Sequence, residues 1–345
     1  MTPFEEDLEY VKNYPLPYDL LKRKNVFITG ATGLIGFQLV KALLAIEDIN
    51  VIASVRNMEK VKKIYNPDEI NRITFVLGDI TEPIEYDGSV DFVIHCAAIT
   101  TSSYLINKPV ETIMTSVIGT NNVLRFSKEK KVISVVYISS MEVYGTFENE
   151  QNEIREYNIG YINHLNVRSN YPESKRLCEN MCISYMSEYS LPVKIARLAQ
   201  TFGAGIFPWE NRVFSQFAKS VINEENIILH TEGKSEGNYC YSRDCVTGLL
   251  TILLKGNDGE AYNVSNPKSH VTIAEMANLV ADKISKGRIN VVYDIPEYNQ
   301  FGYATDVKLK LNSDKLQQLG WNNSVDLVES YERMIRQLKI DLNKI

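Results

Sequence analysis

A tyrosine and a lysine four residues apart are the side chains of this sequence best suited to moving a proton. Tyr171 and Lys175 belong to the run Tyr-Pro-Glu-Ser-Lys, and their spacing places them on one face of a helix. An ammonium beside a phenol favours the phenolate, so we expect Lys175 to lower the pKa of Tyr171 toward neutrality. Tyr171 could then accept or donate a proton near pH 7.

Ser140 adds a hydroxyl that could bind the same substrate oxygen, because it follows an apolar run, residues 134–139, that reads as a strand. A Tyr-x-x-x-Lys pair alone is more often an ordinary exposed helix pair. The catalytic interpretation is favoured here because the strand-end serine and a glycine-rich turn precede the pair in the order that such a site requires.

The glycine-rich turn is the stretch Thr29-Gly30-Ala31-Thr32-Gly33-Leu34-Ile35-Gly36. It follows a strand-like run, residues 26–29, and opens a helix-like pattern over residues 37–45. Glycines at these spacings permit a tight turn, a close approach of a pyrophosphate to the backbone, and close packing of helix on strand. The sequence therefore predicts a dinucleotide-binding turn.

Strands and helices alternate through the first 200 residues. Expected strands are 26–29, 51–55, 74–77, 92–95, 134–139 and 193–197, and expected helices are 37–45, 59–65 and 109–129. This alternation predicts an α/β fold with a Rossmann-type, doubly wound parallel sheet and right-handed crossovers. Ligands of such sheets bind at the carboxyl ends of the strands. The residues expected there are Gly30, Arg56, Asp79, Ala97, Ser139 and Ser140.

The expected organisation has three parts. Residues 1–24 form an N-terminal cap segment, residues 25–200 the dinucleotide-binding domain, and residues 201–345 a smaller C-terminal α/β lobe that holds the substrate. The chain can cross back from this lobe to the sheet. The 345 residues, of which 44% are hydrophobic, are enough for a large core.

Composition argues against several classes of protein. A net charge of −6 with no dense basic stripe is unlike a nucleic-acid-binding protein. No apolar run has the length of a membrane span, and the acidic N-terminus is unlike a secretory signal, so we expect a cytoplasmic protein without a membrane partner. The five cysteines and four histidines lack the spacing of a metal site, so we expect reduced, mostly buried thiols and no metal.

The combined pattern resembles the extended short-chain dehydrogenase/reductases, in the NAD-dependent epimerase/dehydratase family. The resemblance covers nearly the whole chain and is closest to UDP-glucuronate decarboxylases and dTDP-glucose 4,6-dehydratases. The matching residues are Thr29-Gly30-x-x-Gly33-x-x-Gly36, Asp79, His95-x-Ala97-Ala98, Ser139-Ser140-x-x-Val143-Tyr144-Gly145, Tyr171-x-x-x-Lys175, Ala196-Arg197-Leu198, Thr201-Phe202-Gly203 and Leu319-Gly320-Trp321.

This resemblance implies that Tyr171 takes the proton of a sugar hydroxyl while a hydride leaves the same carbon for NAD or NADP. The resulting transient ketone permits epimerisation, loss of water or loss of carbon dioxide. Implied catalytic residues are Ser140, Glu142, Tyr171 and Lys175. Implied cofactor-binding residues are Gly30, Thr32, Gly33, Leu34, Ile35, Gly36, Arg56, Asp79, Ile80, Ala97, Ala98, Tyr171 and Lys175. Implied substrate-binding residues are Thr101, Ser102, Ser140, Gln200 and Arg212.

Local features narrow the reaction. Glu142 occupies a position where dehydratases and UDP-glucuronate decarboxylases carry a functional glutamate, and the pattern from Arg168 to Glu179 is similar to theirs. Met141 replaces the aspartate of dehydratases, and Gly237 or Asn238 replaces an arginine that binds the substrate diphosphate. The resemblance therefore favours a decarboxylase or epimerase of a nucleotide sugar over a dehydratase.

Three alternatives stay open. An arginine after the second expected strand, Arg56, suits the 2′-phosphate of NADP, whereas NAD enzymes usually carry an acidic residue there. A net NADP-dependent reductase or dehydrogenase of a nucleotide sugar is therefore a second hypothesis, and a non-catalytic cofactor-binding regulator is a third.

The helix after Pro109 and the helix carrying Tyr171 resemble those that pair as a four-helix bundle in homodimers of the family.

Overall fold

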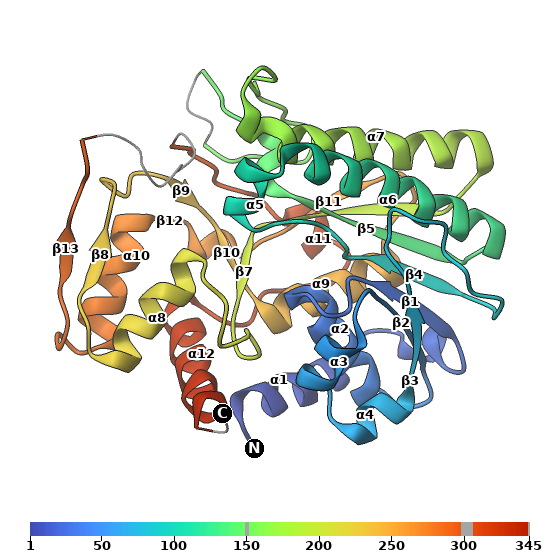
Figure 1. The fold of residues 1–345 in the computed structure, drawn as a ribbon, viewed down its shortest axis with the longest axis horizontal. Helices are drawn as coiled ribbons and strands as arrows, with labels where there is room; N and C mark the ends of the chain where they lie inside the picture. Colours follow the sequence, from blue (N-terminus) through green and yellow to red (C-terminus); the bar gives the residue numbers. More distant parts are fainter. Residues whose placement is uncertain (149–151, 298–305, 344–345) are drawn as a thin grey trace.

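Seven parallel strands form the central sheet of the protein. The structure, a computed structural model, describes residues 1–148, 152–297 and 306–343. The strand order is β11-β6-β5-β4-β1-β2-β3, which reverses direction between β1 and β4 (Figure 1). The strands are β1 (Asn25–Thr29), β2 (Asn50–Val55), β3 (Ile73–Leu77), β4 (Phe92–His95), β5 (Ser134–Ser140), β6 (Val193–Leu198) and β11 (Ala261–Val264). The predicted doubly wound Rossmann-type fold is confirmed.

Apolar runs between turn residues explain how well the strands were predicted. All six expected strands are present, and no boundary differs by more than one residue. The helices of this part are α2 (Leu34–Ala45), α3 (Met58–Ile64), α4 (Pro67–Arg72), α5 (Ser102–Asn107), α6 (Pro109–Lys130), α7 (Asn170–Tyr189) and α9 (Ser242–Lys255). Helix α2 begins three residues before its expected start, because Gly33 is its N-cap and the helix starts inside the glycine-rich turn.

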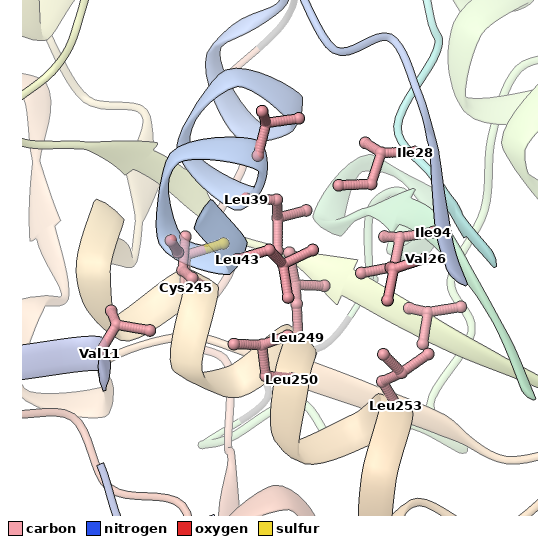
Figure 2. Packing of buried hydrophobic residues seen from close by; sticks show 14 of the residues in the cluster. Val11, Val26, Ile28, Leu39, Leu43, Ile94, Cys245, Leu249, Leu250 and Leu253 are labelled. Atoms are coloured by element: carbon pink, nitrogen blue, oxygen red, sulfur yellow. The ribbon is translucent and has the colours of Figure 1, made fainter. Parts of the chain in front are cut away.

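Helices cover both faces of the sheet. On one face α6 and α7 pack against each other and on strand residues such as Phe27 and Val93. On the other face α2 and α9 meet over Val26 and Ile28, with Leu39 of α2 in the same cluster (Figure 2). Neighbouring residues of β1 thus point to opposite layers. Each fully buried leucine or isoleucine in these layers contributes about 1.5–3 kcal/mol.

The remaining elements build a second core beside the carboxyl ends of the strands (Figure 1). Phe202, Phe214 and Tyr331 pack ring against ring at its centre, with centroids 4.9 and 5.0 Å apart. Its elements are β7 (Gln200–Phe202), α8 (Val213–Asn223), β8 (Ile227–Leu229), β9 (Glu236–Gly237), β10 (Tyr239–Tyr241), β12 (Val271–Thr272), α10 (Ile273–Leu279), η5 (Val280–Ile284), β13 (Val291–Tyr293) and α12 (Leu327–Leu342).

The short helical segments lie in the connections of both parts. They are η1 (Tyr18–Leu21), η2 (Met141–Tyr144), η3 (Val167–Ser169), η4 (Pro267–Ser269) and α11 (Asp314–Gln317). After the loop that follows β7 and the strands β8 to β10, the chain returns through α9 to β11, which pairs with β6. Two of these short segments, η2 and η3, carry candidate site residues.

The N-terminal helix α1 (Pro3–Lys12) contacts α2 of the sheet layers and α12 of the second core. Asp7, which is 3% exposed, binds Arg243 at 3.2 Å and Arg333 at 2.7 Å, and it accepts a hydrogen bond from Tyr241 at 2.6 Å. Phe4 stacks on Phe37 of α2. Helix α1 and the C-terminal helix α12 therefore lie side by side (Figure 1).

Two further predictions concern burial and the membrane. Cys178, Cys182, Cys240 and Cys245 are buried and Cys96 is half-buried, as expected for thiols placed in apolar segments. Over the described parts of the chain, every helix is too short or too polar to cross a membrane.

Candidate active site

The glycine-rich turn has the close backbone approaches that its glycines predict. Gly30 has a φ of +66°, and a Cβ there would lie 2.8 Å from the backbone of Ala97. A Cβ on Gly36 would lie 2.3 Å from the carbonyl oxygen of Gly30. Gly33 is the N-cap of α2 and has no side chain to bond the first turn. Its N–H donates to the carbonyl oxygen of Gly30 at 2.9 Å. The turn therefore fits a pyrophosphate at the positive end of α2.

A charge pair marks the ends of β2 and β3. Arg56 lies 3.5 Å from the carboxylate of Asp79, and both side chains are exposed. Hydrogen bonds from the backbone and hydroxyl of Thr81, and then the charge of Arg56, lower the pKa of Asp79. Ile80 is buried beside Gly119 of α6. The predicted adenosine-side residues are thus neighbours, with Arg56 already paired to a carboxylate.

A buried histidine joins the glycine-rich turn to β4. The Nδ1 of His95 lies 2.7 Å from the hydroxyl of Thr29, which accepts a hydrogen bond from the N–H of Ala97 at 3.1 Å. Burial, and then the charge of Lys175, lowers the pKa of His95 to about 3. His95 is therefore neutral and holds the turn against β4. Ala98, which follows Ala97, is half-buried at the same edge.

Ser140, Tyr171 and Lys175 come together at the carboxyl end of β5. Tyr171 on α7 is 7% exposed and shares a hydrogen bond with Ser140. The Nζ of Lys175 lies 5.9 Å from the ring centre of Tyr171 and donates to the carbonyl of Ile138 at 2.7 Å. The residues are thus arranged as a phenol, a hydroxyl and an ammonium around one strand end.

The predicted lowering of the tyrosine pKa is wrong for this structure. Burial, followed by the charge of Glu142, raises the pKa of Tyr171 above its usual value. Burial also lowers the pKa of Lys175 to about 8. The ammonium points to the carbonyl of Ile138, so it does not offset the burial of the phenol. Tyr171 is therefore a neutral phenol before ligands bind.

Glu142 lies close enough to Tyr171 to act on it and has a partner that sequence reasoning did not assign. It is part of η2, and its carboxylate pairs with both terminal nitrogens of Arg168 from η3, at 3.1 and 3.2 Å. The charges of Glu142 and Arg168 both act on the pKa of Tyr171. The spacing of Arg168 and Tyr171 was the available signal, since Arg168 lies in η3, directly before α7, and Tyr171 lies in the first turn of α7.

Arg212, like Arg168, is paired with a neighbouring glutamate. Its guanidinium forms two hydrogen bonds with Glu210, at 3.0 and 2.7 Å, and its charge also acts on Tyr171. Glu210 was not among the predicted residues. Gln200 begins β7 and is half-buried. Thr101 and Ser102 are exposed at the start of α5, and no contact joins them to Tyr171 among the described hydrogen bonds and ion pairs.

The two departures from the dehydratase pattern touch each other. Met141 is buried, and a Cβ on Gly237 would lie 3.4 Å from its methyl group. Asn238 instead bonds the backbone of Asn266 and Leu311, so its role is structural. No group of three or more ligands for a metal ion occurs among the described side chains.

Comparison with known proteins gives relatives that match along the whole chain. The protein is 30% identical to UDP-glucuronic acid decarboxylase 3 of Arabidopsis thaliana, over 99% of both chains. It is also 30% identical to UDP-glucuronic acid decarboxylase 1 of Danio rerio, over 98% of this chain and 78% of that protein.

Among solved structures, the fold is similar to that of an epimerase from Methanothermobacter thermautotrophicus, with a TM-score of 0.78 and 22% identity over 99% of this chain and 98% of the other. The family model "NAD dependent epimerase/dehydratase family" matches residues 26–265, which include the glycine-rich turn, Ser140, Tyr171 and Lys175. The chain therefore belongs to the NAD-dependent epimerase/dehydratase family.

Proposed function

We propose that this protein decarboxylates a UDP-linked uronic acid, with UDP-glucuronate as the first candidate, through transient oxidation of a sugar hydroxyl. The observation that carries the proposal is the grouping of Ser140, Tyr171 and Lys175 at the end of β5. The charge of Lys175 acts on His95, which bonds Thr29 of the glycine-rich turn. The names of the relatives that match the whole chain support the choice of substrate.

NAD is the proposed cofactor. The close approaches at Gly30 and Gly36 leave no room for side chains, as expected of a turn that holds a pyrophosphate. Arg56 could bind a 2′-phosphate, but the carboxylate of Asp79 lies 3.5 Å from it and would repel that phosphate. A ribose with two free hydroxyls fits this charge pair better, which favours NAD over NADP.

The proposed mechanism gives each side chain one task. Bound NAD supplies a reversible acceptor for the hydride of the oxidised carbon. Tyr171 would act as a phenolate: it would release its proton to solvent once the positive charge of bound NAD lies beside it, and it would then take the hydroxyl proton and become a phenol again. Ser140 would orient the substrate hydroxyl beside it. Lys175, whose Nζ lies 5.9 Å from the ring centre of Tyr171, would hold the ribose of the nicotinamide. Burial lowers the pKa of Lys175 to about 8. This value is still above 7, so the side chain is mainly charged at neutral pH.

Loss of carbon dioxide follows from the ketone. The ketone forms on the ring carbon adjacent to the carbon that bears the carboxylate. It can therefore accept the electron pair of the carbon–carbon bond that breaks when carbon dioxide leaves. Glu142 and Arg168 form a charged pair that acts on Tyr171 and could take part at this stage. Arg168 supplies a cation for the substrate carboxylate, and Glu142 holds it in place. Arg212 would bind the diphosphate in exchange for Glu210.

Epimerisation of the same substrate is the second candidate. It is favoured by one observation: Glu142 is bound to Arg168 and is therefore less available as a base. An epimerase needs no carboxylate of the protein as a base beside the ketone. Dehydration is disfavoured relative to both decarboxylation and epimerisation, because the buried Met141 places a methyl group where dehydratases carry an acid.

Incubation of the protein and NAD with UDP-glucuronate, followed by mass spectrometry, tests the proposal. We expect a product that lacks the mass of carbon dioxide, formed without net reduction of NAD. Glu142→Gln should slow this reaction by about 10- to 100-fold, because it frees Arg168 from its partner. The exposed Glu148→Gln is the matched control and should leave the rate unchanged.

The other products separate the alternatives. An isomer of unchanged mass would replace decarboxylation by epimerisation, and net formation of reduced cofactor would indicate a dehydrogenase. If no nucleotide sugar reacts although NAD binds, the protein is a cofactor-binding regulator and the proposed function is wrong.

We also propose a homodimer formed through α6 and α7, which pack together on one face of the sheet (Figure 1). Large apolar side chains remain exposed on both helices: Val110, Ile113, Met114, Leu177 and Tyr189. Light scattering should therefore give twice the chain mass of 39.3 kDa. Met114→Glu with Leu177→Glu should give the monomer mass, whereas Leu20→Glu, outside these helices, should not. A monomeric wild-type protein would contradict the proposal.

A further inference from the structure

A buried glutamate joins the helix that carries Tyr171 to the strand that carries Ser140. Glu179 lies one helical turn after Lys175 on α7. Its Oε1 accepts a hydrogen bond from the hydroxyl of Ser139 at 2.5 Å. The guanidinium of Arg197 on β6 donates two more, from Nε to Oε1 at 2.9 Å and from Nη2 to Oε2 at 2.7 Å.

Arg197 is itself fixed by several elements. Its Nη1 donates to the hydroxyl of Tyr144 at 3.1 Å and to the carbonyl of Glu156 at 2.7 Å. Tyr144 in turn donates to the side chain of Asn263 on β11 at 2.6 Å. The side chains of Glu179 and Arg197 are 11% and 8% exposed. The pair is thus a rigid, almost dry anchor that spans α7, β5, β6 and β11.

Side chains from three successive turns of α7 contact three consecutive residues of β5. Tyr171 bonds Ser140, Lys175 bonds the carbonyl of Ile138, and Glu179 bonds the residue between them, Ser139. A shift of the helix along the strand would break all three contacts. Because Glu179 is the member bound to Arg197 as well, it determines where the other two lie.

Glu179 also faces the charge of Lys175. The groups packed around that ammonium come from three elements: Glu179, Cys178, Cys182 and Tyr171 of α7, Cys96 and His95 of β4 and its end, and Tyr137 of β5. Burial raises the pKa of Cys96 and Cys182, so these thiols stay protonated, and His95 is neutral. Cys178 and then Glu179 oppose the lowering of the Lys175 pKa by burial, and of these two Glu179 is the carboxylate.

We propose that Glu179, held by Arg197, is a positioning residue for the reaction: it fixes α7 on β5 and so determines where Tyr171 and Lys175 lie. This inference rests on the proposed function of Tyr171 and Lys175. Glu179 touches neither substrate nor cofactor, and it acts through Ser139 and Lys175.

Glu179→Gln tests this role, with Asp7→Asn as the matched control. Asp7 is also a buried carboxylate bound by two arginines, but it joins α1 to the second core. Both variants should lower the melting temperature. Only Glu179→Gln should lower kcat, by about 10- to 100-fold with little change in KM, because only it displaces the reacting groups. Glu179→Asp, which restores the charge, should recover part of kcat.

The pH dependence separates positioning from a purely structural role. Without the carboxylate, Lys175 loses its proton at lower pH, so the alkaline limb of kcat should move to lower pH in Glu179→Gln and stay in place in Asp7→Asn. An unchanged limb together with an unchanged kcat in Glu179→Gln would overturn the inference, because the variant would then behave like the control.

Binding of NAD, measured by calorimetry between about pH 6 and pH 10, gives a readout that needs no turnover. If the charged form of Lys175 binds the ribose of the nicotinamide, affinity should fall as Lys175 loses its proton, and the midpoint of this fall should be lower in Glu179→Gln. A shifted midpoint in a protein that converts no nucleotide sugar would refute the proposed function and still support the role of Glu179. An unshifted midpoint would overturn that role.

Discussion

Tyr171→Phe should reduce turnover of the nucleotide sugar by about 10²- to 10⁴-fold, the usual contribution of a positioned acid or base. The ionised phenol is the group that must take the hydroxyl proton, and Ser140 lies within reach of it. Ring packing is preserved in this variant, so the melting temperature and the affinity for NAD should change little. Initial rates, calorimetry with NAD and thermal denaturation on one preparation give all three results.

Tyr185→Phe is the matched control for this experiment. Tyr185 lies on the same helix and donates to the side chain of Asn121 at 2.8 Å, so the variant also loses one tyrosine hydroxyl and one hydrogen bond. Its turnover should equal that of the wild type. Full activity of Tyr171→Phe would refute the assignment of the base and leave the regulator hypothesis standing.

Gly36→Ala should abolish tight binding of NAD. A Cβ at this position would lie 2.3 Å from the carbonyl oxygen of Gly30 and 2.8 Å from its carbonyl carbon. These are backbone atoms and cannot rotate away, so α2 must move off the glycine-rich turn. Overpacking of this kind costs about 1–3 kcal/mol. Because this distortion lies in the proposed cofactor site, the affinity for NAD should drop by about tenfold for every 1.4 kcal/mol of that cost.

Gly78→Ala is the control for this variant, because a Cβ at Gly78 would meet no atom within 4 Å. Its NAD affinity, measured by calorimetry, and its melting temperature should match those of the wild type. Wild-type affinity in Gly36→Ala would mean that the cofactor does not depend on this turn, and the proposed position of the pyrophosphate would be wrong.

The sequence predicts the sheet well because its signals are local. Apolar strands such as Phe92–His95 are short and bounded by turn residues, and the spacing of Gly30, Gly33 and Gly36 marks the first crossover. Helix α4 was missed because its six residues contain no apolar stripe. Its start is fixed instead by a capping box between Asn66 and Glu69, which is a short-range hydrogen-bond pattern.

Long-range ion pairs explain most of what the sequence could not give. The bonds of Asp7 to Arg243 and Arg333 join residues more than 230 positions apart, and no periodicity links them. The pairing of Glu142 with Arg168 likewise depends on how two short segments fold over α7.

The error about Tyr171 has the same origin as those missed pairs. The spacing of Tyr171 and Lys175 correctly places them on one helix, but burial and the carbonyl of Ile138 decide where the charge of Lys175 acts. A pKa depends on all neighbours of a group, and spacing along a helix supplies only one of them.

The most direct measurement of transient oxidation uses UDP-glucuronate with deuterium on the ring carbons that bear free hydroxyls. The protein is incubated with this substrate and unlabelled NAD, and the sugar and the cofactor are both analysed by mass spectrometry. If a hydride leaves one ring carbon and returns to the sugar, turnover should be slower than with the unlabelled substrate, the product should keep its transferred deuterium, and NAD should remain oxidised. Deuterium that accumulates in the reduced cofactor, or a product formed with no isotope effect and no need for NAD, would contradict the proposed mechanism.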